Sequence, residues 1–302
     1  MHRFRFAAML VAAAMVVTGC DTFFDHHRVR VIDAQENGFF EDGDELILAT
    51  IDFRVKPGVP GSTQVRFNPA SLDKAATGLE DGDVKTISND KGLYVFEDLD
   101  VVSPAALARG EVPEIVGQVI LGIENDLTPR SIIKNGLEGA AEDLELLLID
   151  ILESRTVADL LDDPDALMND LVGAADLFES DASWFDQLLL TLVSLGNADD
   201  ILNFNVLFFV PVTPVLAPIV DNAFAGLPEG FYGGAFPTQF ADGEIVPKMF
   251  ELRFFDHETE YIVETYVGEG TEGYVPPPTP TTQPPFNPCF PDPPPPPNGH
   301  CR

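Results

Sequence analysis

Basic residues are scarce in this chain, which has 17 Lys and Arg against 50 Asp and Glu. Proteins that bind nucleic acid need basic patches, and electrostatic attachment to anionic lipid also depends on Lys and Arg. The composition therefore argues against a nucleic-acid partner and against a membrane contact based on charge. The acidic surface is typical of a protein adapted to high salt or selected for solubility, with divalent-cation binding as the alternative.

Histidine, tryptophan and tyrosine are also few, at five, one and five residues against 23 Phe. A Ser-His-Asp or Cys-His site needs a buried, oriented His. After Cys20, however, His occurs only on an expected tether (His26, His27), an expected hairpin tip (His257) and a tail (His300). The chain also lacks the G-x-S-x-G, H-E-x-x-H, P-loop and Rossmann patterns. These absences favour a protein that is not an enzyme, and the low Trp and Tyr content weakly disfavours a sugar site.

The first twenty residues have the three parts of an export signal. Arg3 and Arg5 are followed by an apolar run of 12 residues (6–17), and small residues then precede Cys20. The run is too short to cross a ~30 Å hydrocarbon core, which takes ~20 helical residues. The motif Val17-Thr18-Gly19-Cys20 resembles the lipobox of bacterial lipoproteins. An ordinary secretory signal is the alternative.

The lipobox resemblance implies a lipid anchor and says nothing of activity. It implies that the signal peptide (1–19) is removed, that the Cys20 thiol carries a diacylglyceryl group, and that the new amine is acylated, for example with palmitate. Two or three acyl chains hold a protein firmly, at ~0.8 kcal/mol per buried CH₂. We therefore expect a cell-envelope protein on the exported side of the cell membrane or outer membrane, with residues 20–27 as anchor and tether. Cleavage leaves 15 basic and 50 acidic residues, a formal charge of −35.

The other two cysteines, Cys289 and Cys301, lie in a C-terminal tail (276–302) that contains 13 Pro in 27 residues. A close pair in an exported protein predicts a disulfide. A metal site that also uses His300 is the weaker alternative, because it lacks a fourth ligand. The tail itself is expected to form extended polyproline II.

Between tether and tail, residues 28–275 predict one folded α+β domain. Alternating apolar residues separated by Gly, Asn, Asp and Pro predict strands over 28–125 and again over 200–270, in an antiparallel sandwich-like or barrel-like sheet. In residues 45–55, Leu46 and Leu48 are expected on one face and Ile47 and Ala49 on the other. Residues 248–268 predict a hairpin whose turn lies at 256–259.

Residues 131–196 predict a helical insert between the two β regions. The apolar stripe over 137–154 has helical spacing, and Leu146 and Ile149 widen it beyond one face, which is typical of a helix that is mostly buried or meets a partner. Residues 201–220 carry no charge. Their Asn and Pro residues favour a buried strand followed by an apolar loop over a transmembrane helix. A loop that dips into the membrane is an alternative.

Calcium is the most specific cofactor hypothesis that the sequence offers. Glu41, Asp42 and Asp44 surround one Gly turn, and Asp81 and Asp83 flank a second. Loops at one end of a sandwich can bring such groups together, and Ca²⁺ prefers several oxygen ligands. Neither turn matches the EF-hand pattern, so solvated turns without a cofactor are the alternative.

These observations favour a membrane-anchored envelope lipoprotein that acts as a non-catalytic binding or structural module. The sequence leaves two other functions open. One is a carrier for a small apolar ligand, with a cavity lined by the Leu-rich helices, Phe208 and Phe209. The other is a hydrolase that uses two facing carboxylates in a cleft. Besides the membrane, an envelope protein or a cell-wall component is an expected partner.

Overall fold

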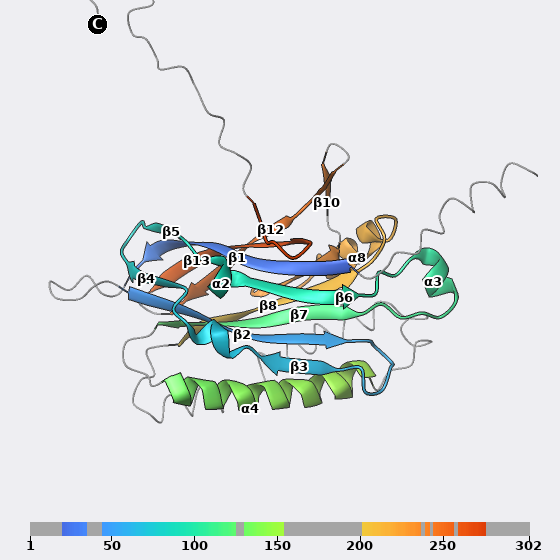
Figure 1. The fold of residues 1–302 in the computed structure, drawn as a ribbon, viewed down its shortest axis with the longest axis horizontal. Coiled ribbons are helices and arrows are strands. Elements are labelled where there is room, and N and C mark those ends of the chain that lie inside the picture. The colour runs from blue at the N-terminus through green and yellow to red at the C-terminus, as the bar shows by residue number, and fades with distance from the viewer. Residues whose placement is uncertain are drawn as a thin grey trace, which may run out of the picture.

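The structure, a computed structural model, describes residues 20–34, 44–124, 130–153, 201–236, 239–241, 244–256 and 259–275. Within them two β-sheets stack face to face, and one long helix lies on the far side of the second sheet (Figure 1). The expected signal peptide, most of the helical insert, His257 and the Pro-rich tail with its two cysteines fall outside the described residues.

The first sheet has five strands and is built around its N-terminal strand. β1 pairs with β13 on one side and with both β5 and β6 on the other, and β12 adds to β13. The β12–β13 pair confirms the hairpin predicted for 248–268. The strands are β1 (Cys20–Asp33), β5 (Val84–Thr86), β6 (Leu93–Leu99), β12 (Lys248–Phe255) and β13 (Glu260–Glu269).

The second sheet has six strands in the order β3-β2-β7-β8-β9, with β4 also paired to β2. All its pairs are antiparallel except β8–β9, and β7 is buried along its whole length. β10 (Gln239–Ala241) and β11 (Glu244–Val246) form a separate hairpin. The strands of the second sheet are β2 (Asp44–Val55), β3 (Gln64–Phe67), β4 (Ala76–Leu79), β7 (Ile115–Glu124), β8 (Ile201–Pro211) and β9 (Phe231–Phe236).

The second sheet separates two hydrophobic cores. Leu46 and Leu48 of β2 belong to the core between the sheets, which we call the inter-sheet core, whereas Ile47 and Ala49 belong to the helix-side core. Successive strand residues point to opposite faces, so this confirms the alternation predicted for 45–55. The described residues therefore form an α+β, sandwich-like fold with one main helix.

That main helix is α4 (Arg130–Leu148), which continues into a π-helical turn, η2 (Ile149–Glu153). One stripe of α4 is buried in the helix-side core, as predicted. Leu146 and Ile149, in contrast, are 65% and 39% exposed. The expectation that the helix is mostly buried is therefore wrong, because the sheet covers only one face of α4, and the alternative that its wider apolar stripe meets a partner stays a prediction. The buried residues of α4 are Ile133, Leu137, Ala140, Ala141, Leu144 and Leu148.

The uncharged segment 201–220 forms the buried strand β8, as predicted, followed by a turn and the short helix α8 (Ala217–Phe224), which the sequence did not predict. Among the described residues, no helix is long and apolar enough to cross a membrane. The remaining short helices are η1 (Pro69–Leu72), α2 (Asn89–Gly92) and α3 (Pro104–Ala108).

Residues 20–27 are part of β1, so the prediction that they form a tether is wrong. Cys20 pairs with Leu99 of β6, and the residues that follow pair with β6 on one side and β13 on the other. Phe24 and His26 are fully buried between the sheets. The two Phe residues at 23–24 cover both faces of the strand, which explains why this segment packs into the sheet. The described fold thus begins at Cys20 instead of residue 28.

Candidate ligand-binding groove

A groove of about 440 Å³ opens at the edge of the sandwich, where β2 and β3 of the second sheet face β6 of the first. The second sheet contributes the polar side chains of Asp52, Arg54, Gln64 and Arg66, and β6 contributes residues 95–97. A concave surface with several polar side chains close together is a candidate binding site.

The strand register explains how the polar groups of the groove meet. Arg66 of β3 lies opposite Asp52 of β2, and Asp52 lies opposite Gln118 of β7. Directly opposite residues of an antiparallel pair share a face, so the three form a transverse row on the face that looks toward the first sheet. Gln118 Nε2 donates a hydrogen bond to Asp52 Oδ1 at 2.8 Å. The row leads from solvent at Arg66 into the inter-sheet core.

Asp52 lies at the inner part of the groove, and its protonation state is altered there. Burial raises its pKa from 3.8 to about 6, against the opposing effects of the Gln118 hydrogen bond and the Arg66 charge. Desolvation disfavours the charged form of a carboxyl. Asp52 is therefore an acid that gains or loses its proton close to neutral pH.

His26 of β1 extends the row across to the first sheet. Its Nδ1 lies 2.9 Å from Thr265 Oγ1, and burial lowers its pKa from 6.5 to about 4, despite the opposing effect of Gln118. The imidazole is therefore neutral at physiological pH. The Gln118 effect on His26 is a side-chain hydrogen bond, so Gln118 connects Asp52 of the second sheet with His26 of the first.

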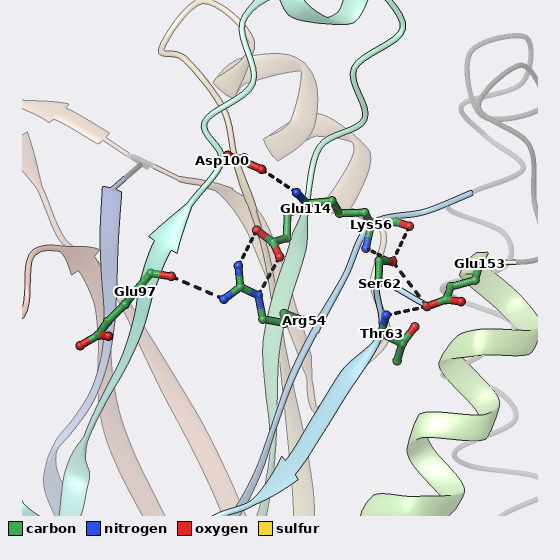
Figure 2. Close-up of polar contacts among 8 residues, drawn as sticks. All are labelled: Arg54, Lys56, Ser62, Thr63, Glu97, Asp100, Glu114 and Glu153. Atoms are coloured by element: carbon green, nitrogen blue, oxygen red, sulfur yellow. Dashed lines mark hydrogen bonds and ion pairs between the residues drawn. The ribbon is translucent and has the colours of Figure 1, made fainter. Parts of the chain in front are cut away.

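The two arginines of the groove, Arg54 and Arg66, differ in their hydrogen-bond and ion-pair partners. Figure 2 shows Arg54 donating to both carboxylate oxygens of Glu114, at 2.7 and 3.0 Å, and reaching the backbone oxygen of Glu97 at 3.5 Å. Arg66 makes no hydrogen bond or ion pair within the described residues, although its charge acts on Asp52. Arg54 thus ties β2 to β6, and Arg66 is the guanidinium that is open to a ligand.

Further contacts fix the same end of β2. Lys56 forms an ion pair with Asp100 at 2.5 Å. Glu153 of η2 accepts from the backbone N–H of Gly61 at 2.8 Å. It also accepts from the backbone N–H of Thr63 at 2.5 Å (Figure 2). Burial opposes ionisation of Glu153, but these hydrogen bonds lower its pKa overall. The loop between β2 and β3 is therefore held by η2 through Glu153 and by the residue that follows β6, Asp100.

A second pocket, of about 370 Å³, lies beside β8 and β9 and is richer in aromatic residues. Its polar groups satisfy one another. Asn203 and Asn205 both donate to the backbone oxygen of Arg253, and Arg253 pairs with Glu260. The groove presents Arg66, which makes no hydrogen bond or ion pair to another described residue, whereas the Asn and Arg side chains of this second pocket are bonded to groups of the protein. The groove is therefore the better candidate site.

The residues of the calcium hypothesis are not brought together in the described part of the chain. Asp44 is buried and accepts from Tyr261 at 2.7 Å, and Asp81 accepts from the backbone of Ala34 at 2.8 Å. Asp83 accepts from the Glu80 backbone at 3.2 Å. No three His, Cys, Asp or Glu of the described residues form a group that fits a metal ion. Glu41 and Asp42 lie outside the described residues.

The apolar carrier and the carboxylate-dependent hydrolase each require a particular arrangement of side chains. Phe208 and Phe209 are buried, and neither lines a described pocket. They pack instead against Phe53 and Phe24, at 5.5 and 5.4 Å between ring centroids. For the hydrolase, Asp52 and Glu97 line one groove, but the Glu97 carboxylate points away from Arg54 in Figure 2.

Sequence reasoning missed His26, Asp52, Arg66 and Gln118. His26 was assigned to a tether, and the other three look like ordinary polar residues of separate strands. Only the β3-β2-β7 register joins them. The one available signal was the Phe23-Phe24 pair before the alternating R-V-R-V, which predicts a strand through His26.

The chain matches no protein-family model, and no curated protein or solved structure is significantly similar to it. A functional assignment therefore depends on the groove and on the N-terminal sequence of this chain.

Proposed function

We propose that this protein is a lipid-anchored, non-catalytic binding module of the bacterial cell envelope, and that the groove binds a small polar ligand. The observation that carries the proposal is the transverse row, in which Arg66 stands at the mouth of the groove with no hydrogen bond or ion pair to another described residue, and the buried carboxyl of Asp52 lies beside it. Polar groups buried in a core cost stability. We attribute their concentration beside this groove to ligand binding.

The chemistry of the row suggests a ligand with two adjacent polar ends. The guanidinium of Arg66 suits a carboxylate or phosphate. Ionised Asp52 accepts from an ammonium or hydroxyl group beside it. A zwitterion such as an amino acid or a peptide terminus meets both requirements, and the opposite Asp52–Arg66 register places the two charges side by side.

The test is an NMR titration with three probes at equal ionic strength: glycine, acetate and methylammonium. We expect glycine to shift the Arg66 Nε–H and Gln118 side-chain amide signals more than either single-charge probe does. Arg66→Gln is expected to abolish the response. Arg30→Gln serves as the matched control, because Arg30 pairs with Glu251 on the solvent side of β1. Equal responses in the two variants would refute the groove as the site.

The anchor is tested separately by intact-mass analysis of protein extracted from membranes. The expected mass is that of the chain from Cys20 with two or three acyl chains, and Cys20→Ser is expected to leave the precursor uncut and unacylated. An unmodified Cys20 in the wild-type protein would refute the anchor while leaving the groove proposal intact.

A further inference from the structure

Cys20 stands directly at the start of β1, with no spacer between the expected lipid and the folded domain. It pairs with Leu99, and the backbone oxygen of the next residue, Asp21, accepts from Gly270 at 2.9 Å. The Cys20 side chain is half-buried against the inter-sheet core. An acyl chain on this sulfur therefore holds the bilayer against the end of the sandwich where β1 begins.

The segment that follows β8 lies at this same end. Just beyond Leu99, Val102 forms a β-bridge with Val212. Val102 also donates to the Pro211 backbone oxygen and accepts from the Thr213 backbone N–H, both at 3.0 Å. The turn and α8 therefore project beside the end of β6, the strand with which Cys20 pairs, as the neighbouring positions of β1, β6 and α8 in Figure 1 also show.

This segment exposes apolar side chains where a soluble surface is expected to be polar. Val215 is 74% and Ile219 67% exposed, and Pro214 and Pro218 are exposed beside them. No charged residue occurs between 201 and 220. Ala217 and Phe224 of α8 are buried in the helix-side core, which fixes the exposed residues in place. We call residues 214–219 the apolar tip.

We propose that the apolar tip inserts into the surface of the bilayer and sets the orientation of the domain on the membrane. This inference rests on the proposed anchor at Cys20. An apolar, uncharged contact suits a chain that carries 15 basic and 50 acidic residues from Cys20 on, a formal charge of −35, because anionic lipid repels such a surface. The opposite end, with the acidic turn at 80–83, then faces away from the membrane.

The experiment uses the full, acylated protein in vesicles of zwitterionic lipid with brominated acyl chains, which quench Trp fluorescence on contact. Val215→Trp reports on the tip. Val84→Trp is the matched control, because Val84 is likewise an exposed valine, at 54%, but lies on β5 at the opposite end. The parent chain, whose only Trp is Trp184, supplies the baseline. Intact mass of the same sample reports acylation of Cys20.

We expect the lipid to quench most of the added signal at position 215 and none of it at position 84. Absence of quenching at 215 in an acylated, vesicle-bound sample would refute insertion of the tip and leave the anchor standing. Equal quenching at both positions would refute a fixed orientation. A sample without acyl mass would refute the anchor, and with it the orientation inferred here.

Discussion

The two faces of the second sheet use the same strands and differ sharply in polarity. On β2, the side chains that point toward α4 are all apolar, from Ile47 to Val55. Those that point toward the first sheet start with Asp44, continue with Leu46 and Leu48, and then change to Thr50, Asp52 and Arg54. The first face is therefore explained by packing alone, whereas the second carries polar side chains at both ends of the strand.

The difference suggests that the helix-side face mainly stabilises the fold, whereas the polar part of the inter-sheet face serves function. Burying apolar area stabilises a domain roughly in proportion to the area removed from water, and the helix-side core follows this rule throughout. Polar residues in the inter-sheet core oppose it, and local violations of the folding rules are expected at functional sites. Substitutions that change one face of the sheet at a time test this difference.

The largest effect is expected on the helix side. Leu144 of α4 is fully buried, and Leu144→Ala should lower the free energy of unfolding by about 3 kcal/mol, through lost burial and the cavity left behind. Leu146→Ala, two residues away and 65% exposed, should change it by less than about 0.5 kcal/mol. Urea unfolding measures both. Similar losses for the two variants would contradict the packing of α4 described here.

A somewhat smaller loss is expected at the charged end of the groove. Arg54→Gln leaves Glu114, whose side chain is 4% exposed, without its cation, and should cost about 2–3 kcal/mol. Arg66→Gln removes a guanidinium without a partner and should cost less than about 0.5 kcal/mol, while it abolishes the glycine response. If Arg66→Gln destabilised the fold as much as Arg54→Gln, Arg66 would have a structural role instead.

Two groups between the sheets, Asp52 and His26, should contribute to the pH dependence of the free energy of unfolding with opposite signs. The pKa of Asp52 is raised from 3.8 to about 6 in the fold, so the folded state holds more protons there and stability falls as pH rises through this range. The pKa of His26 is lowered from 6.5 to about 4, so the unfolded state holds more protons and stability rises with pH over nearly the same range. The two contributions largely cancel in the wild type.

Single substitutions should expose each contribution. Asp52→Asn keeps an acceptor for Gln118 and should make stability rise from pH 4 to 6.5 more steeply than in the wild type, by on the order of 2–3 kcal/mol in total. His26→Asn should have the opposite slope. Urea unfolding at several pH values measures these differences. Parallel profiles for both variants and the wild type would show that neither group titrates abnormally.

The features predicted correctly from the sequence are those that depend on local periodicity. The alternation on β2 and the buried stripe of α4 follow from side-chain spacing along one element. The exposure of Leu146 was missed because spacing alone cannot tell how much of a helix its neighbours cover. Residues 20–27 were missed because an anchor motif suggested a tether, although Phe23 and Phe24 favour a strand.

The groove was not predictable, because its parts meet only through register. Arg66, Asp52 and Gln118 come from three strands, and His26 comes from the other sheet. A shift of one residue in any pairing would turn a side chain to the opposite face. A single sequence does not give the strand pairings, and only the pairings show which polar residues share a face. Sequence motifs therefore could not predict that these four residues are neighbours.

The smallest effect on stability is expected from calcium, whose candidate ligands come from the acidic turns at residues 41–44 and 81–83. Asp44 is bonded to Tyr261 and Asp81 to the Ala34 backbone, so releasing either to a cation breaks an existing hydrogen bond. We expect CaCl₂ to raise the melting temperature no more than NaCl does at equal ionic strength, since both screen a formal charge of −33. A thermal melt with EDTA, Ca²⁺ and Na⁺ measures this. A rise specific to Ca²⁺ that Asp42→Asn removes would instead establish a cation site that includes Glu41 and Asp42.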